Sequence, residues 1–331
     1  MKQLKRLLSV LLVFVMAFTF APVKINAASE NSVKYYFIDV TGSCGKGDAT
    51  LIRYNDHGTL HFVLVDCGPE KDYSTLKNAL SSCIPQTNGK IVLDAVIITH
   101  DHTDHAGALK NLCHDTGKIN KDNIAVVVKN VYCSQIDKNT IANKIETEKT
   151  NIPQTIVSTG KTIELGECTG ITIFGSAKKS NNANQDSMTV EVVGKTTALI
   201  FGDQTYDGLN ATIKKYKNKF SESSYDVCKF GHHGLRTKEE TSDLNDECNL
   251  YNKYIKAKYY IMTTTRDKIE SKSALDNNYK TIKKTLKNYK YIGRSDCTVD
   301  GHGITSRKLY EPGKEVYSNF GGFACNDNEK K

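Results

Sequence analysis

The chain has 331 residues, of which 39% are hydrophobic and 25% are charged, a composition typical of a soluble globular protein with a sizeable core. The length suits one large domain or two small ones. The formal net charge of +8 includes four positive and no negative charges in residues 1–27, so removal of that segment leaves +4. A charge this small is a weak argument for a polyanionic partner.

The first 27 residues resemble a secretory signal peptide. A basic start at Lys2, Lys5 and Arg6 precedes an apolar run, and small residues follow at Ala27 and beyond. The alternative is an uncleaved membrane anchor, but the apolar run is short for a full span. We therefore expect cleavage near residue 27, a secreted protein and no stable membrane association afterwards.

Ten cysteines lie beyond this segment, where an oxidising exterior would permit disulfides. Their spacings are irregular and include no C-x-x-C pair, which argues against a zinc ribbon. Disulfides and buried free thiols are both compatible with the pattern.

The first half of the chain is rich in apolar and β-branched runs, which predict strands. Helical spacing of apolar residues predicts two helices, at 72–83 with Asp72 or Ser74 as the cap, and at 104–113. The predicted strands cover residues 33–40, 49–54, 60–67, 93–99 and 123–133.

The second half begins with further strands and ends with alternating helices and strands. Strands are predicted at 154–158, 161–165, 170–175, 187–193, 195–203, 225–230, 258–264, 290–294 and 303–311. Helices are predicted at 206–220, 240–256 and 273–288. Two blocks of strands punctuated by helices indicate two packed sheets with helices outside. We expect one domain over residues 33–312, followed by a solvated tail at 313–331.

Polar side chains crowd together directly after the apolar strand that ends near residue 99. The sequence there is H-x-H-x-D-H, at His100, His102, Asp104 and His105. Imidazole and carboxylate groups bind zinc, manganese and iron. Residues i and i+2 at a strand end point to the same side, so His100 and His102 can share one ion. Asp104 and His105 can face a second.

Two other apolar strands also end in potential metal ligands. One ends at Asp203, whose carboxylate can bridge two cations, and the other ends at the pair His232 and His233. Lys229, just before that pair, is either a contact for a substrate anion or an ordinary strand-end lysine.

This ordered set of motifs resembles the metallo-β-lactamase superfamily, and within it the branch that includes the hydrolase domain of the competence protein ComEC. The likeness extends over most of residues 34–310. "FIDVTGSCGKGDATLI" resembles the opening turn of that branch, with Asp39, Gly47 and Asp48 in place, and "LVDCG" supplies Asp66.

The resemblance implies an α+β fold, a four-layer αββα sandwich of two mixed β-sheets flanked by helices, with a two-metal site at the strand ends. It implies His233 as the favoured ligand of the histidine pair, with His232 as its neighbour. Asp66 would orient a ligand histidine by hydrogen bonding. The implied ligands are His100 and His102 for the first metal, Asp104 and His105 for the second, and Asp203 as the bridge.

The chain departs from the family pattern in one respect. Many members have another ligand histidine before the bridging acid, whereas this chain has none between His114 and His232. The stretch "NANQDSMTV" lies there instead, so Asn184, Asp186 or Ser187 could touch the first metal directly or through water. Two divalent ions, zinc or manganese, are the expected cofactors.

The expected chemistry is hydrolysis by a metal-activated hydroxide, with Asp104 as a ligand and a candidate proton acceptor. The resemblance favours phosphodiesters, and hence a nucleic acid or another phosphodiester as the substrate. A helix with several lysines at 206–220 could attract such a backbone or could be an ordinary solvated face. The alternatives are hydrolysis of other esters, such as wall-polymer phosphorylcholine, or of lactams or lactones, and a non-catalytic binding module stabilised by metal.

Overall fold

The computed structural model describes residues 32–117, 123–165, 170–177, 179–236, 243–264, 274–287, 289, 291–294, 297–300, 303–306, 309–311 and 314–316. The predicted signal peptide, most of the predicted tail, Cys168 and Cys325 lie outside these ranges.

The predicted elements follow one another in the expected order, but the structure has more strands than expected and two helices, at 138–145 and 147–150, that the sequence analysis did not predict. The strands are β1 (Val33–Phe37), β2 (Thr50–Asp56), β3 (Thr59–Val65), β4 (Lys90–Leu93), β5 (Ala95–Ile98), β6 (Ala125–Val128), β7 (Val131–Ser134), β8 (Gln154–Val157), β9 (Thr162–Leu165), β10 (Gly170–Phe174), β11 (Thr189–Val193), β12 (Ala198–Ile200), β13 (Val227–Lys229), β14 (Tyr259–Met262), β15 (Tyr291–Arg294), β16 (Cys297–Asp300), β17 (Gly303–Ser306), β18 (Leu309–Glu311) and β19 (Lys314–Val316). The helices and helical turns are η1 (Glu70–Asp72), α2 (Tyr73–Cys83), α3 (Thr103–Ala106), α4 (Leu109–Cys113), α5 (Lys138–Ile145), α6 (Thr147–Thr150), α7 (Tyr206–Tyr216), η2 (Gly231–Gly234), α8 (Leu244–Leu250), η4 (Tyr251–Ile255) and α10 (Ala274–Thr285).

Two mixed sheets form the centre of the described part of the molecule. The first has the strand order β17-β16-β1-β2-β3-β5-β7-β8, and the second has the order β19-β18-β15-β14-β13-β12-β11-β10-β9. In the first sheet β3, β5, β7 and β8 run parallel, and in the second β12, β13, β14 and β15 do. Within each sheet, the carboxyl ends of these parallel strands lie at the same edge. Ligand sites in such sheets form at that edge.

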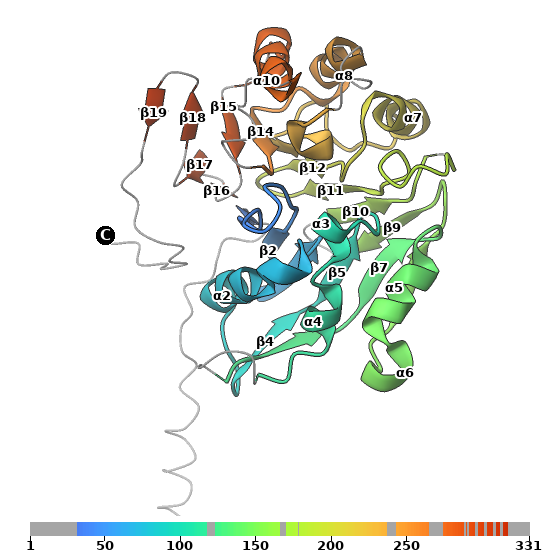
Figure 1. The fold of residues 1–331 in the computed structure, drawn as a ribbon, viewed down its shortest axis with the longest axis vertical. Coiled ribbons are helices and arrows are strands. Elements are labelled where there is room, and N and C mark those ends of the chain that lie inside the picture. Colours follow the sequence, from blue (N-terminus) through green and yellow to red (C-terminus); the bar gives the residue numbers. More distant parts are fainter. Residues whose placement is uncertain are drawn as a thin grey trace, which may run out of the picture.

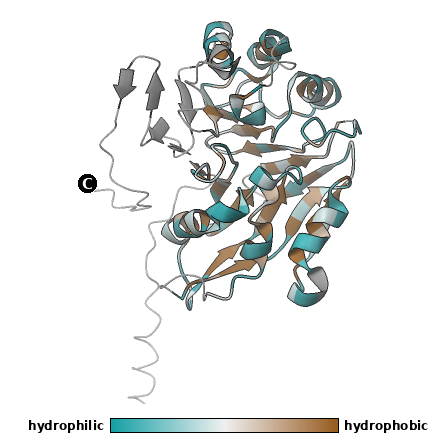
Figure 2. Ribbon diagram, viewed as in Figure 1, coloured by the Kyte–Doolittle hydropathy of each residue, from teal (hydrophilic) through white to brown (hydrophobic). Residues whose placement is uncertain are grey.

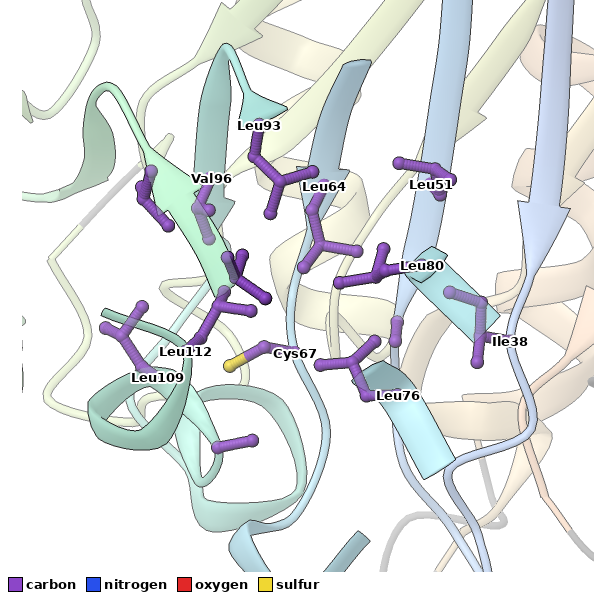
Figure 3. Packing of buried hydrophobic residues seen from close by; sticks show 14 of the residues in the cluster. Ile38, Leu51, Leu64, Cys67, Leu76, Leu80, Leu93, Val96, Leu109 and Leu112 are labelled. Atoms are coloured by element: carbon purple, nitrogen blue, oxygen red, sulfur yellow. The ribbon is translucent and has the colours of Figure 1, made fainter. Parts of the chain in front are cut away.

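Alternate residues of each strand point to opposite faces, and this alternation builds the layers. In the first sheet Ile52, Val63 and Ile97 pack against the second sheet. Their neighbours on the same strands, Leu51, Leu64 and Val96, face the helical layer that contains α2 and α4. Figure 3 shows these leucines and Val96 together with Leu76 and Leu80 of α2 and with Leu109 and Leu112 of α4.

The second sheet is covered in the same way on its outer face. Leu199 and Cys228 pack with residues of α7, α8 and α10, whereas Ala198, Ile200 and Val227 face the first sheet. Figure 1 shows α2, α4 and α5 outside one sheet and α7, α8 and α10 outside the other. The predicted four-layer αββα sandwich is therefore confirmed. Figure 2 shows the matching colour pattern, with hydrophobic strands between helices that carry hydrophilic faces.

Several predicted elements differ in detail. The apolar run 123–133 is two strands, because β6 pairs with β4 in a small separate sheet and β7 joins the first large sheet. Asp72 precedes α2 but makes no capping hydrogen bond, since its carboxylate instead accepts hydrogen bonds from the amide and the hydroxyl of Ser43. The hairpin of β18 and β19 extends past residue 312, where the tail was predicted to begin.

Seven cysteines in the described part of the chain are free thiols, and five of them are buried. Cys67, for example, is fully buried, and burial raises the pKa of its thiol well above the ordinary value. The sequence allowed either disulfides or free thiols, and these seven cysteines are free thiols. Among the described helices none combines the length and the apolar character that crossing a membrane requires.

Candidate metal centre

Three strand ends and one short helix bring the predicted ligands together. His100 follows β5 after a single residue, and α3 carries Asp104 and His105. Asp203 follows β12, and His233 lies in the turn η2 directly after β13. Because β5 belongs to the first sheet and β12 and β13 to the second, the site straddles the junction of the two sheets.

His100, His102 and Asp203 form one group of donors, whose ligand atoms all lie within 4.8 Å of one another. The His100 Nε2 atom is 3.9 Å from Asp203 Oδ2, and both side chains are fully buried. His102, by contrast, is exposed at the start of α3. This group has the composition that the sequence predicted for the first metal.

A second group surrounds the other side of Asp203. The His105 Nε2 atom is 3.0 Å from Asp203 Oδ1, and the His233 Nε2 atom is 3.3 Å from Asp203 Oδ2. Asp104 completes this group, because its Oδ2 atom lies 3.2 Å from the same His233 nitrogen. The two groups share Asp203, which therefore occupies the bridging place expected for it.

The opposite edge of the His105 ring is held by a carboxylate. Its Nδ1 atom lies 2.8 Å from Asp66 Oδ2, as the resemblance implied. Asp66 also accepts hydrogen bonds from the amide and the hydroxyl of Thr99, the residue before His100. One buried acid thus fixes both the start of the H-x-H-x-D-H segment and one of its histidines.

His233 has a corresponding partner that the sequence analysis did not assign, Asp48. The His233 Nδ1 atom lies 3.1 Å from Asp48 Oδ1 and 2.9 Å from the hydroxyl of Thr263. Asp48, His105, Asp203 and His233 also form a cluster of potential ligands within 4.8 Å. Asp48 faces the Nδ1 edges of both rings. We therefore assign it to orienting the two histidines, and not to the group of metal ligands that includes their Nε2 atoms.

Lys229 lies inside the site rather than at a substrate surface. Its side chain is fully buried, its ammonium pairs with Asp48, and it lies 2.5 Å from the Gly202 carbonyl oxygen and 3.4 Å from Asp203 Oδ1. The suggestion that Lys229 contacts a substrate anion is therefore wrong for this structure. A buried lysine is retained here because two carboxylates compensate its charge.

The local backbone requires glycine at two positions beside the site. A side chain at Gly202, which has a φ of +54°, would place its first carbon 2.8 Å from the Thr99 hydroxyl oxygen. One at Gly231 would lie 2.0 Å from the Gln204 carbonyl oxygen. His232 and His233 themselves have φ values of 50° and 56°, a left-handed conformation uncommon for residues other than glycine. Such a turn directs His233 into the site, and strain of this kind is concentrated at functional sites.

Mutual charges shift the pKa values across the site. Burial raises the pKa of the Asp203 carboxyl, but the charges of His105, His233 and Lys229 outweigh burial and bring it well below the ordinary value. Burial lowers the pKa of His233, but Asp203 and Asp48 together raise it to about 9. Burial and the charge of His105 lower the pKa of His100. The carboxylates thus stay ionised and hold positive charge around them.

Unpaired buried atoms test whether cations fit these donors. His100 Nε2 and Asp203 Oδ2 are buried and have no hydrogen-bond partner. Leaving a buried polar atom unpaired is costly, and native proteins rarely do so without a compensating ligand. Imidazole nitrogen and carboxylate oxygen are the donors that zinc and manganese bind, so the residues fit divalent metal ions.

The remaining predicted residues lie at the edge of this cluster. The Ser187 hydroxyl accepts a hydrogen bond from the Asp203 amide, so it positions the bridging acid. Both carboxylate oxygens of Asp186 accept hydrogen bonds from the Ser180 amide. These bonds hold the Asp186 side chain against its own loop. The Asn184 Oδ1 atom is buried without a partner. The His232 Nε2 atom lies 3.9 Å from Asp203 Oδ2.

Sequence reasoning missed three contributors, Lys46, Thr263 and the orienting role of Asp48. A glycine-flanked acid before a strand, as in "GKGDAT", was a usable signal for Asp48. Thr263 carried no such signal, because a threonine after an apolar strand is common. Lys46, on the same loop as Asp48, lies with its Nζ atom 2.6 Å from Asp104 Oδ2.

Comparison with known proteins identifies the domain. Residues 61–206 match the model of the beta-lactamase superfamily domain. No curated protein matched the chain in sequence.

Solved structures of similar fold include three with low sequence identity. The metallo-beta-lactamase fold protein YhfI from Bacillus subtilis is 15% identical, with 81% of this chain and 99% of that chain covered and a TM-score of 0.49. Zn²⁺-bound PqqB from Methylobacterium extorquens is 11% identical, with 78% and 90% covered and a TM-score of 0.49. A long form RNase Z from yeast is 13% identical, with 84% and 43% covered and a TM-score of 0.43.

Proposed function

Because residues 61–206 match the beta-lactamase superfamily domain, we propose that the chain is a metal-dependent hydrolase of the metallo-β-lactamase superfamily and that its substrates are phosphodiesters. One observation carries the proposal. Two groups of histidine and aspartate donors share Asp203, and the buried His100 Nε2 and Asp203 Oδ2 atoms have no hydrogen-bond partner within the protein.

The residues of the site have different roles in metal binding. His100, His102 and Asp203 would hold one cation, and Asp104, His105, His233 and Asp203 would hold the other. When bound, two such cations polarise the scissile group and lower the pKa of water near them. Asp66 and Asp48 keep the rings of His105 and His233 turned with Nε2 toward the shared acid.

Asp104 is better suited to holding a cation than to accepting a proton. Burial raises the pKa of its carboxyl, but the hydrogen bond with His233 and the charge of His105 bring it far below the ordinary value. A carboxylate with so low a pKa is a weak base. We therefore assign Asp104 first as a ligand.

The charge of the site favours an anionic substrate. Four carboxylates lie close to two ammonium groups: Asp48, Asp66, Asp104 and Asp203 beside Lys46 and Lys229. Two bound divalent cations would add four positive charges to the site, and positive charge attracts anions. The ComEC-like motifs around Asp39 and Asp48 support the same substrate class, including nucleic acids.

The test starts from protein purified without chelator. Bound metal is measured by mass spectrometry, and zinc- and manganese-loaded samples are assayed on bis(p-nitrophenyl) phosphate and on single- and double-stranded DNA. We expect about two ions per chain and hydrolysis that is lost in Asp203→Asn. Asp226→Asn is the matched control, because Asp226 lies before β13, at the end opposite the site, and is paired with Lys258.

Each result has a separate meaning. Bound metal without cleavage of any phosphodiester would contradict the substrate class and direct attention to wall-polymer esters, lactams and lactones. Protein that neither contains nor takes up metal would contradict the catalytic proposal and favour a binding module.

We further propose that the chain is exported and that residues 1–27 are removed. The support is the basic start, apolar run and small residues of that segment. Amino-terminal sequencing of the protein from culture medium should begin near Ala28. Protein found only inside cells, with Met1 or Lys2 at its start, would contradict export.

A further inference from the structure

Lys46 has a partly exposed cationic group at the edge of the metal centre. Its Nζ atom lies 2.6 Å from Asp104 Oδ2, and the side chain is 31% exposed. Lys229, the other lysine of the site, is fully buried between Asp48 and Asp203. Of these two cations, Lys46 is therefore the one that a bound molecule can reach.

The loop that carries Lys46 is anchored on both sides. Toward η1, the amide and the hydroxyl of Ser43 donate to Asp72. Toward the end of β14, the Gly47 amide donates to the Thr263 carbonyl oxygen at 3.2 Å, and Lys46 forms an isolated bridge with Thr264. The ammonium group is thus presented from a fixed backbone, unlike that of a freely rotating surface lysine.

The partner of Lys46 is itself a predicted metal ligand. The Lys46 ammonium lies against the carboxylate of that ligand, with Nζ 2.6 Å from Asp104 Oδ2. A cation held by Asp104 would share the negative charge that Lys46 and His233 now both face. The ammonium would then have a donor available for another anion beside the reacting centre.

From this arrangement we propose that Lys46 binds a phosphoryl oxygen of the substrate and makes the site selective for esters that carry a negative charge. The inference rests on the proposed hydrolase function and specifies its substrate class. Lys46 is a positioning residue in this scheme, because it holds the substrate anion while the Asp203-centred donors serve the reaction.

The experiment separates anion binding from turnover. Binding of inorganic phosphate to the metal-loaded protein is measured by calorimetry for the natural chain and for Lys46→Gln, Lys46→Arg and Lys258→Gln. Lys258 is a matched control, because it also pairs with an aspartate at 2.7 Å but lies before β14, at the opposite end of that strand from Thr263. KM and kcat are measured in parallel for bis(p-nitrophenyl) phosphate and for the neutral ester p-nitrophenyl acetate.

We expect Lys46→Gln to weaken phosphate binding about tenfold or more, the usual worth of a charge-assisted hydrogen bond. KM for the phosphodiester should rise by a similar factor, whereas kcat, the neutral ester and metal content should change little. Lys46→Arg should restore most of the binding, and Lys258→Gln should match the natural chain. Melting curves confirm that each variant is folded.

Two results would overturn the inference. Unchanged phosphate binding and KM in Lys46→Gln would show that Lys46 serves only as the counter-ion of Asp104, and a metal-loaded natural chain that binds no phosphate would do the same. If the natural chain cleaves no phosphodiester but Lys46→Gln still weakens phosphate binding, the proposed function fails while the anion site stands.

Discussion

The inner histidines of the site, His105 and His233, are each fixed from behind by an acid. Asp66 faces Nδ1 of His105, and Asp48 faces Nδ1 of His233, so the Nε2 atoms of both rings point toward Asp203. A carboxylate in this position selects the tautomer and the orientation of a ligand imidazole. The two orienting acids are thus as much a part of the donor set as the histidines that they hold.

Replacing Asp66 by Asn should test whether the Asp66 carboxylate orients His105, because the two side chains have nearly the same shape. Asn also tolerates the left-handed φ of 56° found at Asp66, and it can keep one hydrogen bond to Thr99. We expect metal affinity to fall about 10- to 100-fold, measured by competition with a fluorescent chelator. An affinity equal to that of the natural chain would show that the Asp66 charge does not orient His105.

Asp137 gives a prediction for stability away from the ligands. It is buried, and burial raises the pKa of its carboxyl to about 6 against a weaker opposing hydrogen bond from Ser134. The folded protein then binds this proton more tightly than the unfolded chain, so stability falls as pH rises from about 4 to 6. Asp137→Asn should therefore be more stable than the natural chain at pH 8, by ~1–3 kcal/mol.

Urea unfolding at several pH values measures that difference. The gap between Asp137→Asn and the natural chain should be small near pH 4, grow up to about pH 6 and then level off. Asp207→Asn, which removes an exposed carboxylate, is the control for the loss of one negative charge. A gap that is constant from pH 4 to pH 8 would contradict the assignment to Asp137.

At the scale of elements, short turns after buried strands place the ligands. The turn η2 is fixed by Arg236, whose guanidinium donates to the Gly231 carbonyl oxygen and pairs with the buried Glu247 of α8. The turn also needs room, because the backbone at Gly231 lies against Gln204. The position of His233 therefore depends on packing between segments far apart in sequence.

Gly231→Ala should disrupt this turn. The added carbon would meet the Gln204 carbonyl oxygen at 2.0 Å, so backbone must move. We expect a loss of ~2 kcal/mol or more in unfolding free energy, together with weaker metal binding at His233. Gly170→Ala is the control, because the nearest atom to its added carbon is 4.0 Å away. Equal metal binding and stability in both variants would contradict the role of the turn.

Sequence alone predicted most elements and the ligands around Asp203, because these depend on local patterns. Buried strands appear as apolar runs, and the ligand motif His100–His105 is contiguous. Partners across the fold were harder to find. Lys229 was interpreted as a contact for a substrate anion or as an ordinary strand-end lysine, because nothing local shows that Asp48 compensates its charge. The role of Lys46 depends on the position of its loop beside Asp104, which the local sequence does not show. The division of 123–133 into two strands depends on which neighbours each part finds, β4 or β5.

At the scale of the whole molecule, the metal centre joins the two sheets. The first sheet and α3 supply His100, Asp104 and His105, whereas the second supplies Asp203 and His233. Without a cation, the contacts across the junction include several acids of like charge. Ligands that bind only the folded state raise its stability.

Removing metal should therefore lower the melting temperature of the entire domain. With free metal at 100 to 1,000 times its dissociation constant, the linked stabilisation is about 3–4 kcal/mol. Differential scanning calorimetry with and without chelator measures the shift, which should be absent in Asp203→Asn and present in Asp226→Asn. A chelator effect of equal size in Asp203→Asn would contradict a link through this site.

The distances along the chain between site residues have a consequence for folding. His233 meets Asp104 across 129 positions, and Thr263 meets Asp48 across 215. Contacts of such large sequence separation close late, because the chain entropy of long loops must be lost before they form. The complete donor set thus forms only when segments far apart in the sequence have come together. Tight metal binding during refolding would then appear only at the last step of folding. A partly folded chain would bind metal ions weakly, because its donor set would be incomplete.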